Sequence, residues 1–235
     1  MAIGLEVALL PGFAIARRID YEGDWKRHLM LSPAIGLLVC FGLAGITSIL
    51  EMTLSTLTYL LIASNIIAIV AIRVELNPIP MNKNIERNPW FWIFTIIACF
   101  IAITPLTYMR PMGVDWIGFA SLTDAFSRNG GFILSEPSVG KWLYPPAFPT
   151  LAAWLPGSSL DSVFWLGVMS FVALLLGIAA VGEKMGCGHW TIMAMLLGPA
   201  LFAKNLDSGY PTVASQLGLV VILLMFGEKL NWLIV

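Results

Sequence analysis

The stretch LMLSPAIGLLVCFGLAGITSIL, residues 29–50, decides the fold class because it carries no charged side chain. About 20 helical residues, each rising about 1.5 Å, cross the ~30 Å hydrocarbon core of a bilayer. Strong apolar segments also occupy residues 53–72, 90–108, 160–181 and 210–226, and weaker ones occupy residues 2–16 and 189–203. The sequence therefore predicts an all-α, polytopic transmembrane helical bundle of about seven spans.

The composition of the 235 residues predicts a single membrane domain, residues 1–235. Apolar side chains make up 58% of the chain and charged ones 11%, against about 25% charged in an average soluble domain. The net charge of −1 offers no basic face for nucleic acid. Near the end, Glu228, Lys229 and Asn231 predict a short loop before the apolar run WLIV. Because the chain stops where a further span would start, this pattern is expected of a truncated chain or of a split gene.

Lysine and arginine predict the orientation of the spans, because these residues are enriched in cytoplasmic loops. Loops 17–28 and 73–89 are both basic and are separated by two spans. Both are therefore predicted to be cytoplasmic in a multi-pass protein of the cell membrane. The long loop 109–145 is then extracytoplasmic.

The proline-rich segment 145–156 leaves the later topology open, since it suits an interfacial or re-entrant piece better than a span. If it does not cross, loop 182–188 is cytoplasmic and loop 204–209 is external. If it does cross, these two loops exchange sides. We prefer the first alternative, which places Lys184 and Lys229 in the cytoplasm.

The external loop 109–145 is the densest polar and aromatic part of the chain. Loops of this length are usually functional or disordered, and the aromatic content of this one argues against disorder. Residues 116–128 predict a short helix lying along the membrane surface. The sequence Asn129-Gly130-Gly131 predicts its C-terminal end.

Asp115 is the candidate catalytic residue of this loop. A partly desolvated carboxylate at the membrane boundary can act as a general base toward a hydroxyl. The alternative is an N-cap for the helix that begins near Trp116, a position that aspartate favours. The sequence alone leaves both interpretations open.

Three other loop residues are candidate substrate contacts with ordinary structural alternatives. Asp124 falls on the same predicted helix and would equally suit a solvated polar face. Trp116 and Tyr144 could contact a substrate, or they could belong to the aromatic belt of the membrane interface.

The cationic side chains Arg110, Arg128 and Lys141 are the candidate contacts for a phosphate group. Arg110 could instead snorkel from a helix end. Lys141 could form a surface pair with Glu136. The loop thus has enough positive charge for an anionic substrate, although each residue has another possible role.

A second polar island, KNLDSGYP at residues 204–211, contains Asp207. Aspartate in a Ser-Gly turn usually serves the turn itself. In the preferred topology Asp207 faces the same compartment as Asp115, and the two carboxylates could bind Mg or Mn through oxygen ligands. A metal requirement stays open on the sequence.

Two polar residues inside apolar segments have structural interpretations. Asn65 is predicted to make an interhelical hydrogen bond. Glu6 is close enough to the chain start for its carboxylate to reach water.

Several motifs resemble the opening of a family of multi-pass membrane proteins. These are LPGFAIARRI at 10–19 and LSPAIGLLVCFGLAG at 31–45, followed by GVDWIGFASLTDAF at 113–126, NGG at 129–131 and KWLYPPAF at 141–148. The later motifs are similar to the first external loop of the GT-C superfamily of membrane glycosyltransferases. The resemblance covers residues 10–215.

The resemblance implies transfer of a sugar from a polyprenyl-phosphate donor to an acceptor on the extracytoplasmic side. The family's acidic loop residue corresponds to Asp115, which would deprotonate or orient the acceptor. The surface helix corresponds to residues 116–128. Trp116 and Phe119 stand where relatives often carry a second acid or a histidine, so a paired-carboxylate metal site there is not expected.

A different class of function remains open beside the glycosyltransferase. The chain could be a non-catalytic integral membrane subunit with a membrane-protein partner, or a transporter-like protein. Binding of a lipid phosphate and a sugar by the long loop distinguishes the enzyme from the subunit. Against transport, the spans contain no inverted repeat or evident charged pathway.

Overall fold

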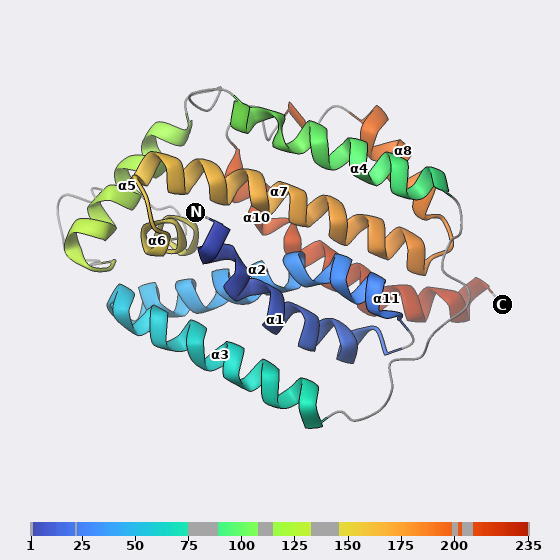
Figure 1. The fold of residues 1–235 in the computed structure, drawn as a ribbon, viewed down its shortest axis with the longest axis horizontal. Helices are drawn as coiled ribbons and strands as arrows, with labels where there is room; N and C mark the ends of the chain where they lie inside the picture. Colours follow the sequence, from blue (N-terminus) through green and yellow to red (C-terminus); the bar gives the residue numbers. More distant parts are fainter. Residues whose placement is uncertain are drawn as a thin grey trace.

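The computed structural model describes residues 2–21, 23–74, 89–107, 115–132, 146–198, 202–203 and 209–234. Within these residues the regular structure is helical, with one isolated bridge between Thr53 and Gly131 and no strand. The long helices lie side by side in an elongated bundle (Figure 1). The predicted all-α class is confirmed.

The first part of the chain forms α1 (Ala2–Ile19), α2 (Trp25–Ile49), α3 (Leu54–Val74), α4 (Pro89–Ile103) and the 3₁₀ helix η1 (Thr104–Thr107). The second part forms α5 (Asp115–Asn129), α6 (Ala147–Trp154), α7 (Ser159–Lys184), α8 (Gly188–Leu197), α10 (Tyr210–Ser215) and α11 (Leu217–Ile234).

Four helical segments of the described chain are long and apolar enough to cross a bilayer. They are Trp25–Ile49, Leu54–Val74, Pro89–Leu106 and Ser159–Lys184. Large apolar side chains are exposed along α3 and α4, among them Ile67 and Phe100. Outward-facing apolar surface of this kind suits contact with lipid rather than water. The chain is therefore a membrane protein by the length and composition of its helices.

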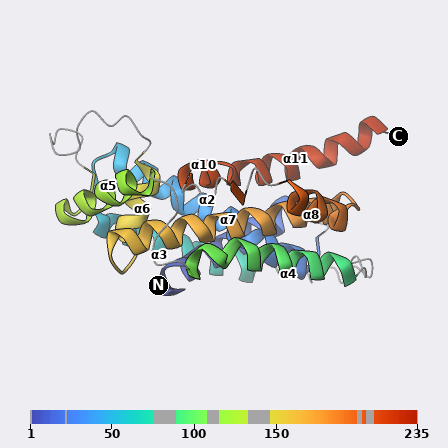
Figure 2. The ribbon, with the colours of Figure 1, turned by 90° about the horizontal axis from the view of Figure 1, so that it is seen from above.

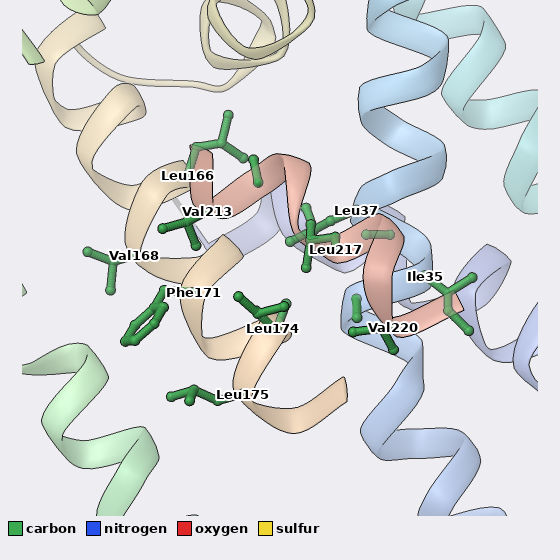
Figure 3. Packing of buried hydrophobic residues seen from close by; sticks show 14 of the residues in the cluster. Ile35, Leu37, Leu166, Val168, Phe171, Leu174, Leu175, Val213, Leu217 and Val220 are labelled. Carbon is green, nitrogen blue, oxygen red and sulfur yellow. The ribbon is translucent and has the colours of Figure 1, made fainter. Parts of the chain in front are cut away.

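Helix α7 is the centre of the bundle. In the apolar 18-residue stretch of α7, 72% of the residues are buried, against 17% in the corresponding stretch of α3. Figure 2 shows α7 between α4 on one side and α10 with α11 on the other. Figure 3 shows side chains of α2, α7, α10 and α11 meeting in the core, including Leu37, Leu174 and Leu217. A helix that is apolar on all sides can be enclosed by its neighbours in this way.

Helices α1 and α2 form a closely packed antiparallel pair. Gly12 lies against the backbone of Ser32, and Gly36 lies against the backbone of Ala8. Small residues at four-residue spacing let two helix backbones approach closely within a membrane. Proline occurs inside both helices, at Pro11 and Pro33.

Asn65 on α3 makes the predicted interhelical hydrogen bond. Its Nδ2 donates to the carbonyl oxygen of Val7 on α1 at 2.9 Å and also to that of Leu61 at 2.9 Å. The Asn65 side chain thus joins α3 to the α1–α2 pair. Glu6 is exposed, as its position near the chain start predicts.

The segment expected as a single helix over 210–226 is interrupted at Gln216, between α10 and α11. The short loop expected at Glu228, Lys229 and Asn231 was wrong, because α11 remains helical to Ile234. Lysine, glutamate and the apolar neighbours are compatible with helix, and no proline or glycine follows Gly227 to end it.

Segment 145–156 does not cross the bundle. Its helix α6 has 8 residues, which is about 12 Å of helix and far short of a span. Figure 1 shows α6 almost end-on between the longer helices. Most of α6 is buried, and Thr150 on it makes a 2.7 Å hydroxyl–hydroxyl hydrogen bond with Ser48 of α2.

The turns of the bundle gather at two ends. Arg27 near the start of α2 pairs with Glu183 near the end of α7, so these turns share one end. At the other end, the Leu54 amide donates to the carbonyl of Gly130 at 2.7 Å, which joins the α2–α3 turn to the end of α5. Loops 17–28 and 182–188 therefore lie at the same end of the bundle. This arrangement is the one expected if segment 145–156 does not cross.

Candidate functional site

Helix α5 carries the catalytic candidate at its exposed start. Asp115 is the first residue of α5 and its side chain is exposed. Phe119, Leu122, Thr123 and Phe126 are buried on one face of the helix, at the spacing that places side chains on one stripe. The predicted helix is confirmed, and the turn at Gly130, with φ of +70°, follows it as expected.

Asp124 and Arg128 bind each other. Their carboxylate and guanidinium lie 2.7 Å apart, one helical turn along α5, and the side chains are 51% and 72% exposed. An exposed pair of this kind contributes little to stability. Asp124 therefore lies on an exposed polar face of α5, which is its structural alternative. The guanidinium of Arg128 pairs with Asp124 in the structure.

Two aromatic residues connect the Asp115 helix to an apolar groove. Phe119, one turn beyond Asp115, contacts Phe148 of α6 with ring centroids 5.9 Å apart. Phe148 stacks on Phe41 of α2 at 5.9 Å. Trp116 is half-buried and packs against the same core. Helix α5 is therefore tied to α6 and, through Phe148, to α2 by aromatic contacts.

The groove lies between α2, α6 and α10 and has a volume of about 350 Å³. Its lining is mainly apolar, with the hydroxyls of two α10 residues at one side. The lining residues are Leu38, Phe41, Ala147, Phe148, Pro211, Thr212, Ala214 and Ser215. Because two of its walls belong to helices of the membrane bundle, the groove suits a hydrocarbon chain better than a polar molecule.

Four predicted site residues, Arg110, Lys141, Tyr144 and Asp207, lie outside the described residues. Their approach to Asp115 therefore stays a prediction, as does a Mg or Mn site that involves Asp207. Among the residues that the structure describes, no group of three or more histidine, cysteine, aspartate or glutamate side chains could hold a metal ion.

A buried ionic cluster at the opposite end of the bundle was not anticipated. The Asp20 carboxylate is fully buried and accepts from Arg27 Nε at 2.5 Å and from Arg27 Nη2 at 3.1 Å. Lys184 Nζ lies 3.2 Å from Asp20 Oδ1. Arg27 Nη1 also donates to Glu183 Oε2 at 2.9 Å.

His28 and Asp24 complete this cluster. His28 Nε2 lies 2.8 Å from the carbonyl oxygen of Asp20. Asp24 caps α2 by accepting from the Arg27 amide at 2.8 Å. In the sequence, loop 17–28 resembles an ordinary basic cytoplasmic loop. Acidic residues within the two predicted cytoplasmic loops could have indicated the cluster. Asp20 and Asp24 lie in loop 17–28, and Glu183 lies in loop 182–188.

Comparison with known proteins adds no family. No protein-family model matches the chain, and no curated protein or solved structure matches it. The functional interpretation therefore depends on the residues, the geometry and the motif resemblance.

Proposed function

We propose that this protein is a membrane glycosyltransferase-like protein that acts on a polyprenyl-phosphate-linked sugar at the α5 end of the bundle. One observation carries the proposal. An exposed carboxylate, Asp115, lies one helical turn from Phe119, and Phe119 contacts the wall of an apolar groove at Phe148. A lipid-linked substrate needs these two features close together, because its reacting head is polar and its anchor is hydrocarbon.

In this proposal the lipid chain occupies the groove and the sugar phosphate lies near the start of α5. Asp115 removes the proton of the acceptor hydroxyl as that oxygen attacks the sugar carbon. The bond from that carbon to the phosphate oxygen breaks, and the phosphate leaves with the electron pair. Arg110 and Lys141 are the cations proposed to stabilise it, since a positive group near a developing anion lowers the barrier.

The topology proposed with this activity has about seven spans. The α1–α2 turn and loop 73–89 face the cytoplasm, and α5 faces the extracytoplasmic side of the cell membrane. The apolar segments Gly188–Leu197 and Tyr210–Phe226 are shorter than the four long apolar segments, so their crossing depends on neighbouring residues.

Replacing Asp115 with asparagine is expected to lower the rate of sugar transfer by about 10²–10⁴-fold, the usual contribution of a general base. The measurement is transfer from a panel of polyprenyl-phosphate sugars by the protein in nanodiscs. Asp161→Asn is the matched control, because Asp161 is also exposed in the first turn of a helix, α7. Equal rates for Asp115→Asn and the wild type would remove Asp115 from catalysis.

Filling the groove tests the lipid-binding half of the proposal without an acceptor. Ser215 is exposed and lines the groove, so Ser215→Trp should displace lipid chain from it. Loss of two buried methylenes at about 0.8 kcal/mol each predicts on the order of tenfold weaker labelling by a photoactivatable polyprenyl phosphate.

Leu219→Trp is the control for this measurement, since Leu219 is exposed one turn further along α11 and does not line the groove. The label should map to peptides of α6 and α10 in the wild type. Equal labelling of both tryptophan variants and the wild type would contradict a lipid site in the groove and favour the non-catalytic subunit.

A further inference from the structure

The turn between α1 and α2 separates its charges between interior and surface. In the sequence, the three acids of this turn lie between one pair of basic residues, Arg17 and Arg18, and another, Lys26 and Arg27. In the structure, Asp20 is fully buried and Asp24 is 6% exposed. Arg27 faces inward with them, its side chain 12% exposed and bound to Asp20 and Glu183. Glu22 lies outside the described residues.

Three other basic residues of the turn are less buried than Asp20 and Asp24. Arg18 is exposed, and Arg17 and Lys26 are half-buried. Burial of Asp20 and Asp24 withdraws two negative charges from the surface on which these cations lie. Of the described residues of the turn, the two acids thus lie inside the fold, whereas Arg18 and Lys26 lie nearer the surface.

Two large aromatic side chains of the same turn are also exposed. Tyr21 is 77% exposed and Trp25 is 48% exposed. Lys26 Nζ lies 5.9 Å from the centroid of the Trp25 ring, within the range of a cation–π contact. Tyrosine and tryptophan concentrate at the headgroup level of a bilayer, where one part of the ring is apolar and another is wet.

The start of a long apolar segment beside the turn indicates that the turn lies at headgroup depth. Trp25 begins the apolar segment Trp25–Ile49, which is long enough to cross the membrane, and the α7 segment ends beside it at Lys184. The start of a span marks the boundary between hydrocarbon and headgroups. Figure 1 places the turn at the end of the bundle away from α5 and α6.

We propose that the outer face of the α1–α2 turn, formed by Arg18, Tyr21, Trp25 and Lys26, binds the headgroups of anionic phospholipids in the adjoining leaflet. The cations attract the phosphodiester, and the two rings lie among the glycerol and upper acyl groups. A soluble anion would gain from the cations alone, whereas an anionic lipid uses both features. This surface is separate from the Asp115 end and does not depend on the proposed transfer reaction.

The test is lipid binding by the full chain, measured by native mass spectrometry in titrations with phosphatidylglycerol and with phosphatidylcholine. The wild type should prefer phosphatidylglycerol. Each basic residue near an anionic surface contributes a factor of about five in binding. The double variant Arg18→Gln/Lys26→Gln should therefore bind phosphatidylglycerol about 25-fold more weakly, with its phosphatidylcholine binding unchanged.

The matched control compares single variants. Arg73→Gln removes one positive charge from a residue exposed elsewhere on the molecule, as Arg18→Gln removes one from the turn. Arg73→Gln should retain most phosphatidylglycerol binding, and an equal loss in the two single variants would overturn the proposal, since net charge alone would then explain the binding. Displacement of phosphatidylglycerol by inorganic phosphate at constant ionic strength would also overturn it, because the site would then take a free phosphate.

Discussion

Replacing Arg27 with methionine is expected to lower the free energy of unfolding by about 3–5 kcal/mol, the usual cost of removing one partner from a buried ion pair. Asp20 has no exposure and takes two of its contacts from Arg27. Without the guanidinium, Asp20 keeps the nearby ammonium group of Lys184. Glu183 loses the hydrogen bond that it accepts from Arg27. The measurement is thermal or denaturant unfolding of the protein in detergent micelles.

An exposed ion pair elsewhere in the chain provides the control. Arg128→Met removes an arginine that lies 2.7 Å from Asp124, but at the surface of α5, so its cost should be below about 1 kcal/mol. The double variant Asp20→Asn/Arg27→Met should recover much of the loss, because it removes the uncompensated carboxylate. Similar costs for Arg27→Met and Arg128→Met would contradict the buried cluster.

Replacing Gly36 with alanine is expected to separate α1 from α2 and to destabilise the bundle by about 3 kcal/mol, the upper part of the range for overpacking. A Cβ at position 36 would lie 1.8 Å from the carbonyl oxygen of Ala8. The obstacle is backbone, so a change of rotamer cannot relieve it. Gly12 makes the reciprocal contact, with a Cβ position 1.9 Å from the carbonyl oxygen of Ser32.

Gly42, which lies on the same helix, provides the control for Gly36→Ala. A Cβ there meets nothing within 4 Å, and alanine is the better helix former by about 1 kcal/mol. Gly42→Ala should therefore leave the melting temperature unchanged or raise it, while Gly36→Ala lowers it. Equal melting temperatures for the two variants would show that α1 and α2 are not packed as closely as described.

The local pattern predicted much of the helical structure. The long apolar segments correspond to α2, α3, α4 with η1, and α7. The short helix in the long loop and its Gly130 stop were also predicted, because capping and turn signals act over a few residues. The break at Gln216 was missed, since apolar residues continue on both sides of it.

The candidate site was predictable in part. The sequence predicted that a helix begins near Asp115, and in the structure Asp115 is the exposed first residue of α5. The contact of Phe119 with Phe148 and the groove beyond it could not be predicted. These features depend on how α6 packs against α2 and α5, and a proline-rich segment of this length does not specify its own neighbours.

The sequence by itself determined the class of protein and which apolar segments are long enough to cross, because apolar length is matched to the thickness of a bilayer. The tertiary structure alone decided that α7 is central and that Arg27 meets Glu183 from 156 positions away. Inside a membrane, lipid and protein neighbours are both apolar, so hydrophobicity does not indicate which helices pack together. That choice was made by close backbone contacts, such as Gly36 against Ala8, and by the pairing of buried charges.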